Sequence, residues 1–95
     1  MPVFAVIYQY DPARHDLRME KRPEHRAFLD SLESEGVLLA GGAWTDDGAP
    51  GGLLVARVAD MASVAAAFDR DPYHRLGVLA QRTIRQWAQL WGPWP

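Results

Sequence analysis

The sequence contains no cysteine, so disulfide bonds, thiolate catalysis and cysteine-ligated zinc sites are all excluded. Positive charge is also sparse: ten Lys and Arg stand against twelve Asp and Glu, and the net charge is −2. Because binding to phosphates needs concentrated positive charge, a nucleic-acid partner is disfavoured. No apolar stretch is long enough to span a bilayer, and no signal peptide is recognisable, so we expect a cytoplasmic protein that does not bind membranes.

One small domain is the simplest organisation for this chain. Its 95 residues leave no room for two cores, and no linker or repeat interrupts them, so residues 1–95 are expected to form a single domain. A domain of this size buries only about 60–65 % of its unfolded surface, and a partner subunit would add stability. Four Trp, three Tyr and three Phe are also present, and aromatic residues need either a core or a pocket.

Four segments have the composition of β-strands. Val3–Tyr10 is a nearly continuous run of β-branched and aromatic residues that stops at a turn signal, Asp11-Pro12, which is typical of a central strand. The other strands are expected at Val37–Trp44, Leu53–Val58 and Val78–Leu90, with a hairpin loop over Thr45–Gly52. The last strand is long enough to extend past the body of the sheet.

The first predicted helix is Pro23–Glu35. Pro23 suits the first helical position, where its missing N–H costs nothing, and Gly36 is a suitable stop. The charged stretch before it, Ala13–Arg22, has no clear period and is expected to be a connecting loop that carries function.

The second predicted helix is Met61–Arg70. Asp60 is a suitable N-cap, and Asp71-Pro72 ends the helix because the residue before a proline avoids the α region. One more helical turn is expected at Tyr73–Gly77.

The order of these elements, β-α-β-β-α-β, predicts a ferredoxin-like α+β sandwich. Two helices then cover one face of a four-stranded antiparallel sheet and leave the other face bare, with aromatic residues such as Trp44 and Trp87 on it. Exposed apolar patches mark association sites, so we expect a homodimer that packs sheet against sheet.

His25 is the first candidate for chemistry. Phe28, Leu29 and Leu32 follow it at helical spacing, which places His25 on the inward face of the first predicted helix. A position in the first turn, together with partial burial, would disfavour the imidazolium and leave a neutral imidazole able to act as a base. An inward histidine is more often a hydrogen-bonded core residue, and spacing alone favours that interpretation.

Asp71 is the second candidate, at the point where the second helix breaks. An aspartate there would face the sheet and the first helix and could fix the tautomer of a nearby imidazole. The local alternative, which spacing favours, is that Asp71 caps the short turn that follows it. No metal is expected, because the three histidines have no Asp or Glu at ligand spacing.

Five short segments occur along the chain in the order that one protein family shows. They are Arg22-Pro-Glu-His-Arg-Ala-Phe-Leu, Gly36-Val-Leu-Leu-Ala-Gly-Gly, Gly51-Gly-Leu-Leu-Val, Arg70-Asp-Pro-Tyr and Ile84-Arg-Gln-Trp. Together they resemble the YCII-related family of small bacterial proteins over nearly the whole chain. The R-x-x-H-x-x-x-L and D-P-Y pieces are the most specific. The chain departs from the usual pattern at Gln86, where proline is common, and in its Trp- and Pro-rich tail.

The resemblance implies a dimeric α+β barrel related to muconolactone isomerase and similar ring-modifying enzymes. It also implies that His25 and Asp71 form a catalytic dyad. Some members of the family are dehydrochlorinases of chlorinated hydroxyquinols that use neither a metal nor an organic cofactor, so no cofactor is expected here.

Two functions remain open at this point. In the first, a cofactor-free lyase or isomerase moves a proton of a small cyclic or phenolic substrate with His25, while Asp71 orients the imidazole. The residues expected to hold the substrate are Tyr8, Trp44, Tyr73 and His74; Arg14 and Arg18 could hold an anionic group, although arginines in an exposed loop are ordinary. The alternative is a non-catalytic, dimeric ligand-binding or accessory module, because one fold supports both functions.

Overall fold

Four strands form one antiparallel sheet in the order β2-β3-β1-β4, in a computed structural model that describes residues 1–95. The strands are β1 (Val3–Tyr10), β2 (Leu38–Ala43), β3 (Gly51–Arg57) and β4 (Leu79–Trp87). β1 lies between β3 and β4, as its apolar run predicts, because a strand in this position is paired on both edges.

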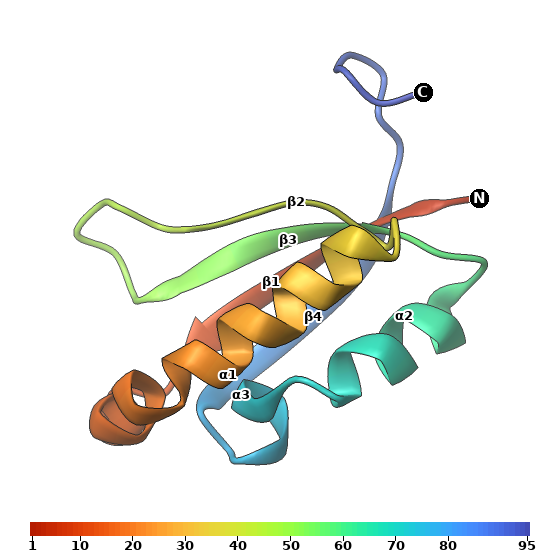
Figure 1. The fold of residues 1–95 in the computed structure, drawn as a ribbon. Helices are drawn as coiled ribbons and strands as arrows, with labels where there is room; N and C mark the ends of the chain where they lie inside the picture. Colours follow the sequence, from red (N-terminus) through yellow and green to blue (C-terminus); the bar gives the residue numbers. More distant parts are fainter.

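The helices all lie on one side of this sheet (Figure 1). They are the 3₁₀ turn η1 (Pro12–Arg14), α1 (His15–Ser34), α2 (Met61–Asp69) and the short α3 (Pro72–Arg75). The segment after β4 extends away from the sheet on the side opposite the helices (Figure 1). The predicted ferredoxin-like sandwich is therefore confirmed.

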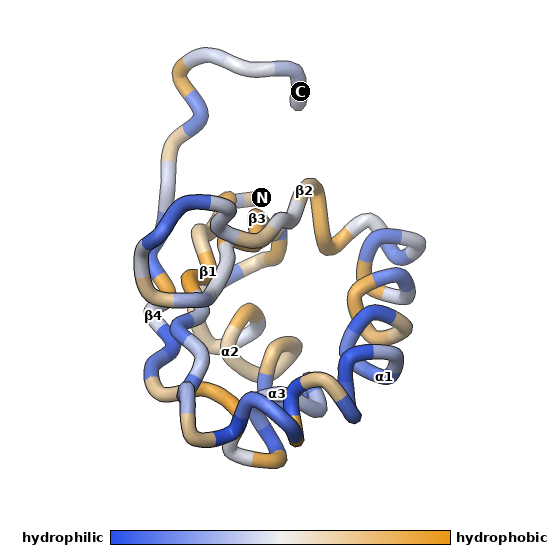
Figure 2. Tube along the Cα trace, turned by 90° about the vertical axis from the view of Figure 1, so that its left-hand side faces the viewer, coloured by the Kyte–Doolittle hydropathy of each residue, from blue (hydrophilic) through white to orange (hydrophobic).

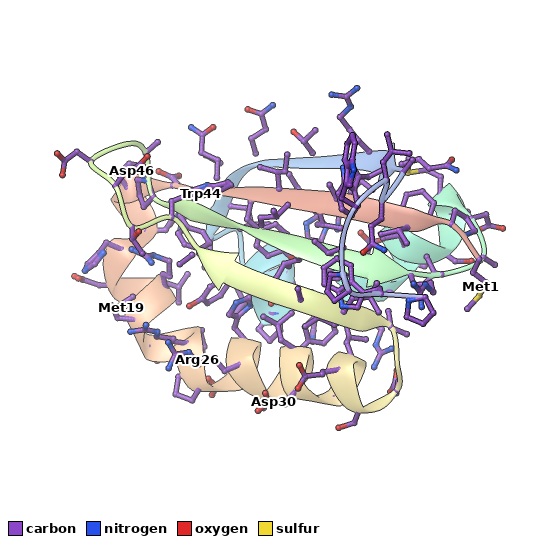
Figure 3. The ribbon with its side chains drawn as sticks, turned by 90° about the horizontal axis from the view of Figure 1, so that it is seen from above. Met1, Met19, Arg26, Asp30, Trp44 and Asp46 are labelled. Carbon is purple, nitrogen blue, oxygen red and sulfur yellow. The ribbon has the colours of Figure 1, made fainter.

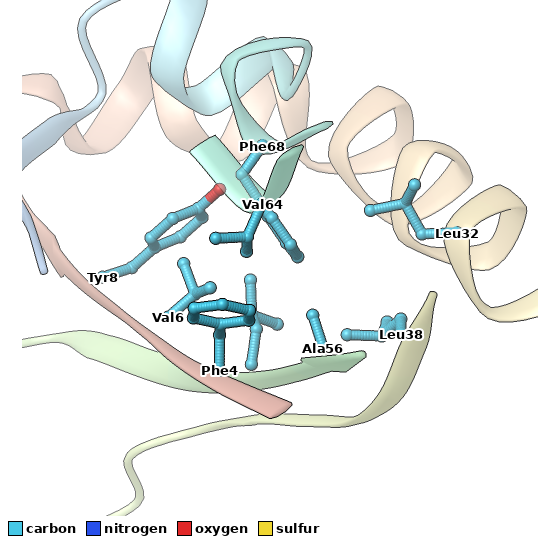
Figure 4. Close-up of a cluster of buried hydrophobic side chains, with 9 residues drawn as sticks. Phe4, Val6, Tyr8, Leu32, Leu38, Ala56, Val64 and Phe68 are labelled. Carbon is cyan, nitrogen blue, oxygen red and sulfur yellow. The ribbon is translucent and has the colours of Figure 1, made fainter. Parts of the chain in front are cut away.

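The core lies between the sheet and the helices. Alternate residues of β1, namely Phe4, Val6 and Tyr8, point into it and are almost wholly buried. Figure 4 shows them packed against Val64 and Phe68 of α2, with the Tyr8 hydroxyl at the edge of the cluster. α2 is hydrophobic along most of its length, whereas α1 is mainly hydrophilic (Figure 2), so the two helices contribute unequally to the core.

α1 differs from the prediction at its N-terminal end. It begins at His15, so the stretch Ala13–Arg22 is almost entirely helical and is not a connecting loop. Pro23 consequently lies inside the helix, where it removes one backbone hydrogen bond and its ring crowds the preceding turn. The helix changes direction between Met19 and Arg26 (Figure 3), as expected for an interior proline.

Other predicted boundaries move less. β4 ends at Trp87 instead of Leu90 and pairs with β1 along its length, so the prediction that it extends past the sheet was wrong. β3 begins at Gly51, inside the predicted hairpin loop. Asp60 caps α2 as predicted: its side chain accepts the Ser63 backbone N–H, and hydrogen bonds from Ser63 hold the pKa of this carboxyl below its usual range.

None of the helices combines the length and the apolar composition that crossing a membrane requires. The cytoplasmic location stays a prediction from the sequence.

Candidate active site

A histidine and an aspartate from distant parts of the chain are in contact between the helices and the sheet. Nδ1 of His25, on α1, lies 2.9 Å from both carboxylate oxygens of Asp71, the residue before α3. Asp71 is fully buried, and only 8 % of His25 is exposed. A contact of this length is within the range of a strong hydrogen bond.

Asp71 also receives two other donors. Its Oδ1 accepts the backbone N–H of Tyr73 at 2.9 Å, and its Oδ2 accepts the hydroxyl of Tyr8 at 2.8 Å. The first of these bonds makes Asp71 the N-cap of α3, as the local alternative from the sequence predicted. Three donors compensate for the removal of a carboxylate from water, so a buried charge is sustainable at this position.

The contact with Asp71 determines the tautomer of His25. A carboxylate has only acceptors, so Nδ1 must carry the hydrogen that lies between the two groups. Nε2 of the neutral imidazole is then left with a free lone pair. An imidazole in this state is a general base at Nε2, and the adjacent carboxylate stabilises the imidazolium that forms.

Tyr73 holds the imidazole plane. Its ring is stacked on the His25 ring at 3.8 Å between centroids and 3° between planes. The Tyr73 hydroxyl donates to the backbone carbonyl of Arg18 at 3.1 Å, which ties α3 to the first half of α1. One side chain therefore fixes both the orientation of His25 and the position of the helix segment that precedes it.

The predicted position of His25 in a first helical turn was wrong. His25 lies in the middle of α1, because the helix begins at His15 and not at Pro23. The positive end of the helix dipole is consequently too far away to act on the imidazole. The charged group in direct contact with the imidazole is the neighbouring Asp71 carboxylate.

A cavity of about 280 Å³ adjoins this pair. Its lining comes from the sheet, from α1, from the edge strand β2 and from α3: Tyr8, Tyr10, Arg18, Arg22, His25, Arg26, Leu29, Gly41, Gly42, Ala43, Gly52, Leu54 and Tyr73. For comparison, an apolar cavity of about 150 Å³ holds benzene. The space beside His25 is therefore sufficient for one substituted ring.

Two of the four residues expected to hold a substrate line this cavity, and two do not. Tyr8 and Tyr73 lie in its wall. Trp44 follows the C-terminal end of β2 (Figure 3) and is 48 % exposed. It lines a separate shallow hollow of the sheet. His74 is directed to the surface, where its Nε2 lies 3.4 Å from Asp69.

The sequence reasoning did not assign most of the polar lining. The sequence predicted Tyr10 only as a strand residue and gave no functional role to Arg22 or Arg26, all three of which line the cavity. The signal that could have found the arginines is their spacing: with Arg18 they recur every four residues, which places them on one side of a helix. The interpretation of Ala13–Arg22 as a loop concealed that spacing.

The three tyrosines of the cavity, which are Tyr8, Tyr10 and Tyr73, stay protonated well above neutral pH. Burial raises the pKa of each phenol. For Tyr8 the negative charge of Asp71 raises the pKa further, whereas the charge of Arg18 opposes the effect of burial on Tyr10. The hydroxyls of Tyr8 and Tyr73 already donate to Asp71 and to the backbone carbonyl of Arg18, so the cavity offers a ligand its guanidinium groups and the hydroxyl of Tyr10.

No three His, Asp or Glu side chains come close enough together to ligate a metal ion. The polar chemistry of the cavity is that of one imidazole–carboxylate pair, three phenols and three guanidinium groups.

Comparison with known proteins gives a consistent picture. The family model of the YCII-related domain matches residues 3–88. No curated protein matches the sequence.

Solved structures that share the fold include the following two. One is 5-chloro-2-hydroxyhydroquinone dehydrochlorinase (TftG) from Burkholderia phenoliruptrix AC1100, in complex with 2,5-dihydroxybenzoquinone; it superposes with a TM-score of 0.80 at 19 % identity, covering 90 % of this chain and 93 % of that chain. The other is an antibiotic biosynthesis monooxygenase, with a TM-score of 0.58 at 16 % identity, covering 93 % of this chain and 97 % of that chain. At these identities the similarity establishes the fold alone.

Proposed function

This chain belongs to the family of YCII-related domains, and we propose that its residues form one domain that is a cofactor-free lyase or isomerase of a small cyclic or phenolic compound. The observation that carries the proposal is the contact of His25 Nδ1 with Asp71 at 2.9 Å in the wall of a cavity of ring size. A histidine of this kind in a dry, closed core would have no ligand to act on.

The proposed chemistry is a proton transfer at Nε2 of His25. The imidazole takes a proton from a carbon or a hydroxyl of the ring, and Asp71 stabilises the imidazolium through Nδ1–H. In an elimination, the electron pair of the broken bond to hydrogen forms a double bond and expels a leaving group such as chloride, after which Nε2 releases its proton to water. In an isomerisation, Nε2 returns the proton to another atom of the same substrate.

The cavity tyrosines suit a ring substrate. Tyr8 and Tyr10 present aromatic surface to the cavity, and Tyr73 contacts the imidazole itself. The structurally similar dehydrochlorinase acts on a chlorinated hydroxyhydroquinone. We therefore favour halogenated hydroquinols as the first compounds to be tested, with lactones as the second class.

The test is turnover of a panel of chlorinated hydroquinols and lactones, followed by chloride release and by changes in ultraviolet absorbance. We expect His25→Ala to reduce turnover by about 10²–10⁴-fold, which is the usual contribution of a general base. His74→Ala is the matched control, because it removes an imidazole that lies outside the cavity, and it should retain turnover. Equal turnover by wild type and His25→Ala would remove His25 from the mechanism.

The alternative function makes a different prediction in the same experiment. A ligand-binding module would bind members of the panel without converting them, and His25→Ala would change affinity alone. Binding without turnover of any compound would therefore favour the module over the enzyme.

A homodimer is part of the proposed functional state. The face of the sheet opposite the helices carries the other alternate residues of the strands, including Val3, Ala5 and Ile7, with Leu53 directly beside Ile7. Trp87, 42 % exposed, lies on this face next to Val3. No helix covers these side chains (Figure 1), and a second copy of the chain would remove them from water.

A further inference from the structure

Three arginines of one helix line the His25 cavity. Arg18, Arg22 and Arg26 follow one another at four-residue intervals on α1, so they lie along one side of it. We call these residues the arginine row. Like charges at this spacing on a helix repel each other, so the row is unfavourable for the helix alone.

No carboxylate neutralises the arginine row. The ion pairs of the structure join His25 to Asp71, and His74 and Arg82 to Asp69, and none includes a member of the row. Asp71 is the one carboxylate hydrogen-bonded to residues of the cavity lining, and both of its oxygens already accept hydrogen bonds. Three guanidinium groups beside this single carboxylate give the cavity an excess of positive charge.

Arg18 is the most constrained member of the row. Its guanidinium carbon lies 4.5 Å from the centre of the Tyr10 ring, and one terminal nitrogen lies 3.2 Å from Nδ1 of His15. Its Nε is shielded from water and has no hydrogen-bond partner. Buried donors are almost always satisfied in native proteins, so the guanidinium group of Arg18 has hydrogen-bonding capacity that the chain leaves unused beside the cavity.

We propose that the arginine row binds an oxyanion group carried by the ring substrate of the His25 cavity. A guanidinium group presents a planar fork of donors that matches two oxygens of a carboxylate or a sulfonate. Arg22 precedes His25 by three residues, so their backbone positions lie about one helical turn apart and both side chains line the same cavity. The inference rests on the proposed function because both use the same cavity.

Binding of three probes with the same ring tests the inference by isothermal titration calorimetry. The probes are 2,5-dihydroxybenzoate, 2,5-dihydroxybenzenesulfonate and hydroquinone, which has no anionic substituent. We expect the wild-type protein to bind at least one anionic probe ten or more times as tightly as hydroquinone. Arg18→Gln and Arg22→Gln should each reduce this preference about tenfold, which is the usual effect of one charge-assisted hydrogen bond.

Lys21→Gln is the matched control. It removes the same charge from α1, one residue from Arg22, and Lys21 is not part of the cavity lining. The preference for the anionic probes should survive in this variant. Arg22 is exposed, so Arg22→Gln tests the row even if Arg18→Gln fails to fold.

Equal affinity of the wild type for the anionic and neutral probes would overturn the inference, and so would an equal loss of preference in Lys21→Gln. A preference for carboxylate or for sulfonate supports it in either case and identifies the geometry of the anion. The binding assay needs no turnover, so failure of the proposed function is seen separately. If no compound is converted but His25→Ala still prefers the anionic probes, the inference stands and the proposed catalysis does not.

Discussion

Replacing Asp71 by asparagine changes the site by one atom and tests the reasoning about the tautomer directly. The position of Oδ1 faces the backbone N–H of Tyr73, which is a fixed donor, so the amide oxygen must take that place in Asp71→Asn. The amide NH₂ then takes the place of Oδ2, where it faces Nδ1 of His25 at 2.9 Å and the Tyr8 hydroxyl at 2.8 Å. The hydroxyl can rotate and accept, but Nδ1 accepts from the amide only if it has lost its hydrogen. If Nδ1 keeps its hydrogen, it must share Oδ1, which is also 2.9 Å away, with the Tyr73 N–H.

The substitution is therefore expected to move the hydrogen of His25 from Nδ1 to Nε2. The cavity then faces an N–H group instead of a lone pair, and the base is lost. Keeping the original tautomer would set one amide N–H against Nδ1–H and leave that amide donor without an acceptor, and an unsatisfied buried donor costs about 1–3 kcal/mol. Loss of a general base reduces the rate by roughly 10²–10⁴-fold, which corresponds to about 3–5 kcal/mol of activation free energy.

Two measurements check this expectation. Long-range proton–nitrogen NMR of the His25 ring should show protonated Nδ1 in the wild type and protonated Nε2 in Asp71→Asn, without need of a substrate. Turnover of the active compounds of the panel should fall by the factor given above. Asp69→Asn is the matched control, because Asp69 lies on the surface and pairs with Arg82 and not with His25. An unchanged tautomer in Asp71→Asn, with circular dichroism showing a folded protein, would refute the argument.

Three further predictions follow from the packing, the ionisation and the bare face of the sheet. Gly52→Ala should lower the free energy of unfolding by about 1–3 kcal/mol in urea titrations, because its Cβ would lie 2.4 Å from the carbonyl oxygen of Gly42, whereas Gly42→Ala meets no atom within 4 Å and should not destabilise. The cavity tyrosines have raised folded pKa values, so their stabilising contribution is complete below the ordinary tyrosine pKa near 10 and is lost as pH rises further. Tyr10→Phe should therefore reduce the alkaline loss of stability by up to about 1.4 kcal/mol per pH unit, and an unchanged slope would contradict its burial as an uncharged phenol. Light scattering should give twice the chain mass of 10.6 kDa for the wild type and the monomer mass for Ile7→Glu, while Leu76→Glu, an exposed position after α3, should leave the dimer intact.

The strands and the topology were predictable because their signals are local. The apolar run of β1 and the turn residues between the elements set the order β-α-β-β-α-β, and the handedness and pairing follow from that order. The glycines after α1 and α3 were also informative, since Gly36 and Gly77 both have the positive φ that ends a helix. These features depend on neighbouring residues, so one sequence is enough to show them.

The beginning of α1 was not predictable in the same way. Pro23 is equally suited to the first turn of a helix and to a bend within one, and the residues around it decide between the two. Here the contacts that hold this part of the chain come from outside the helix: the Tyr73 hydroxyl binds the backbone carbonyl of Arg18, and the ring of Tyr10 lies against the Arg18 guanidinium group. Local propensity contains no information about such contacts. The first half of α1 was therefore not predicted to be helical, and the helical spacing of the arginine row was not recognised.

The two interpretations of Asp71 that the sequence left open are compatible, because a carboxylate has two oxygens and several lone pairs. Oδ1 caps α3 through the Tyr73 N–H, and the same carboxylate orients His25 through Nδ1. The cap positions the carboxylate relative to the backbone of α3, and the Tyr8 hydroxyl of β1 holds its other oxygen, so the place of the partner that the imidazole meets is set by two separate elements. The hydrogen bond that caps a helix also fixes the side chain that accepts it. An acid–base pair needs side chains that are held rigidly in this way. The local cap is therefore the means by which the fold places Asp71 against His25.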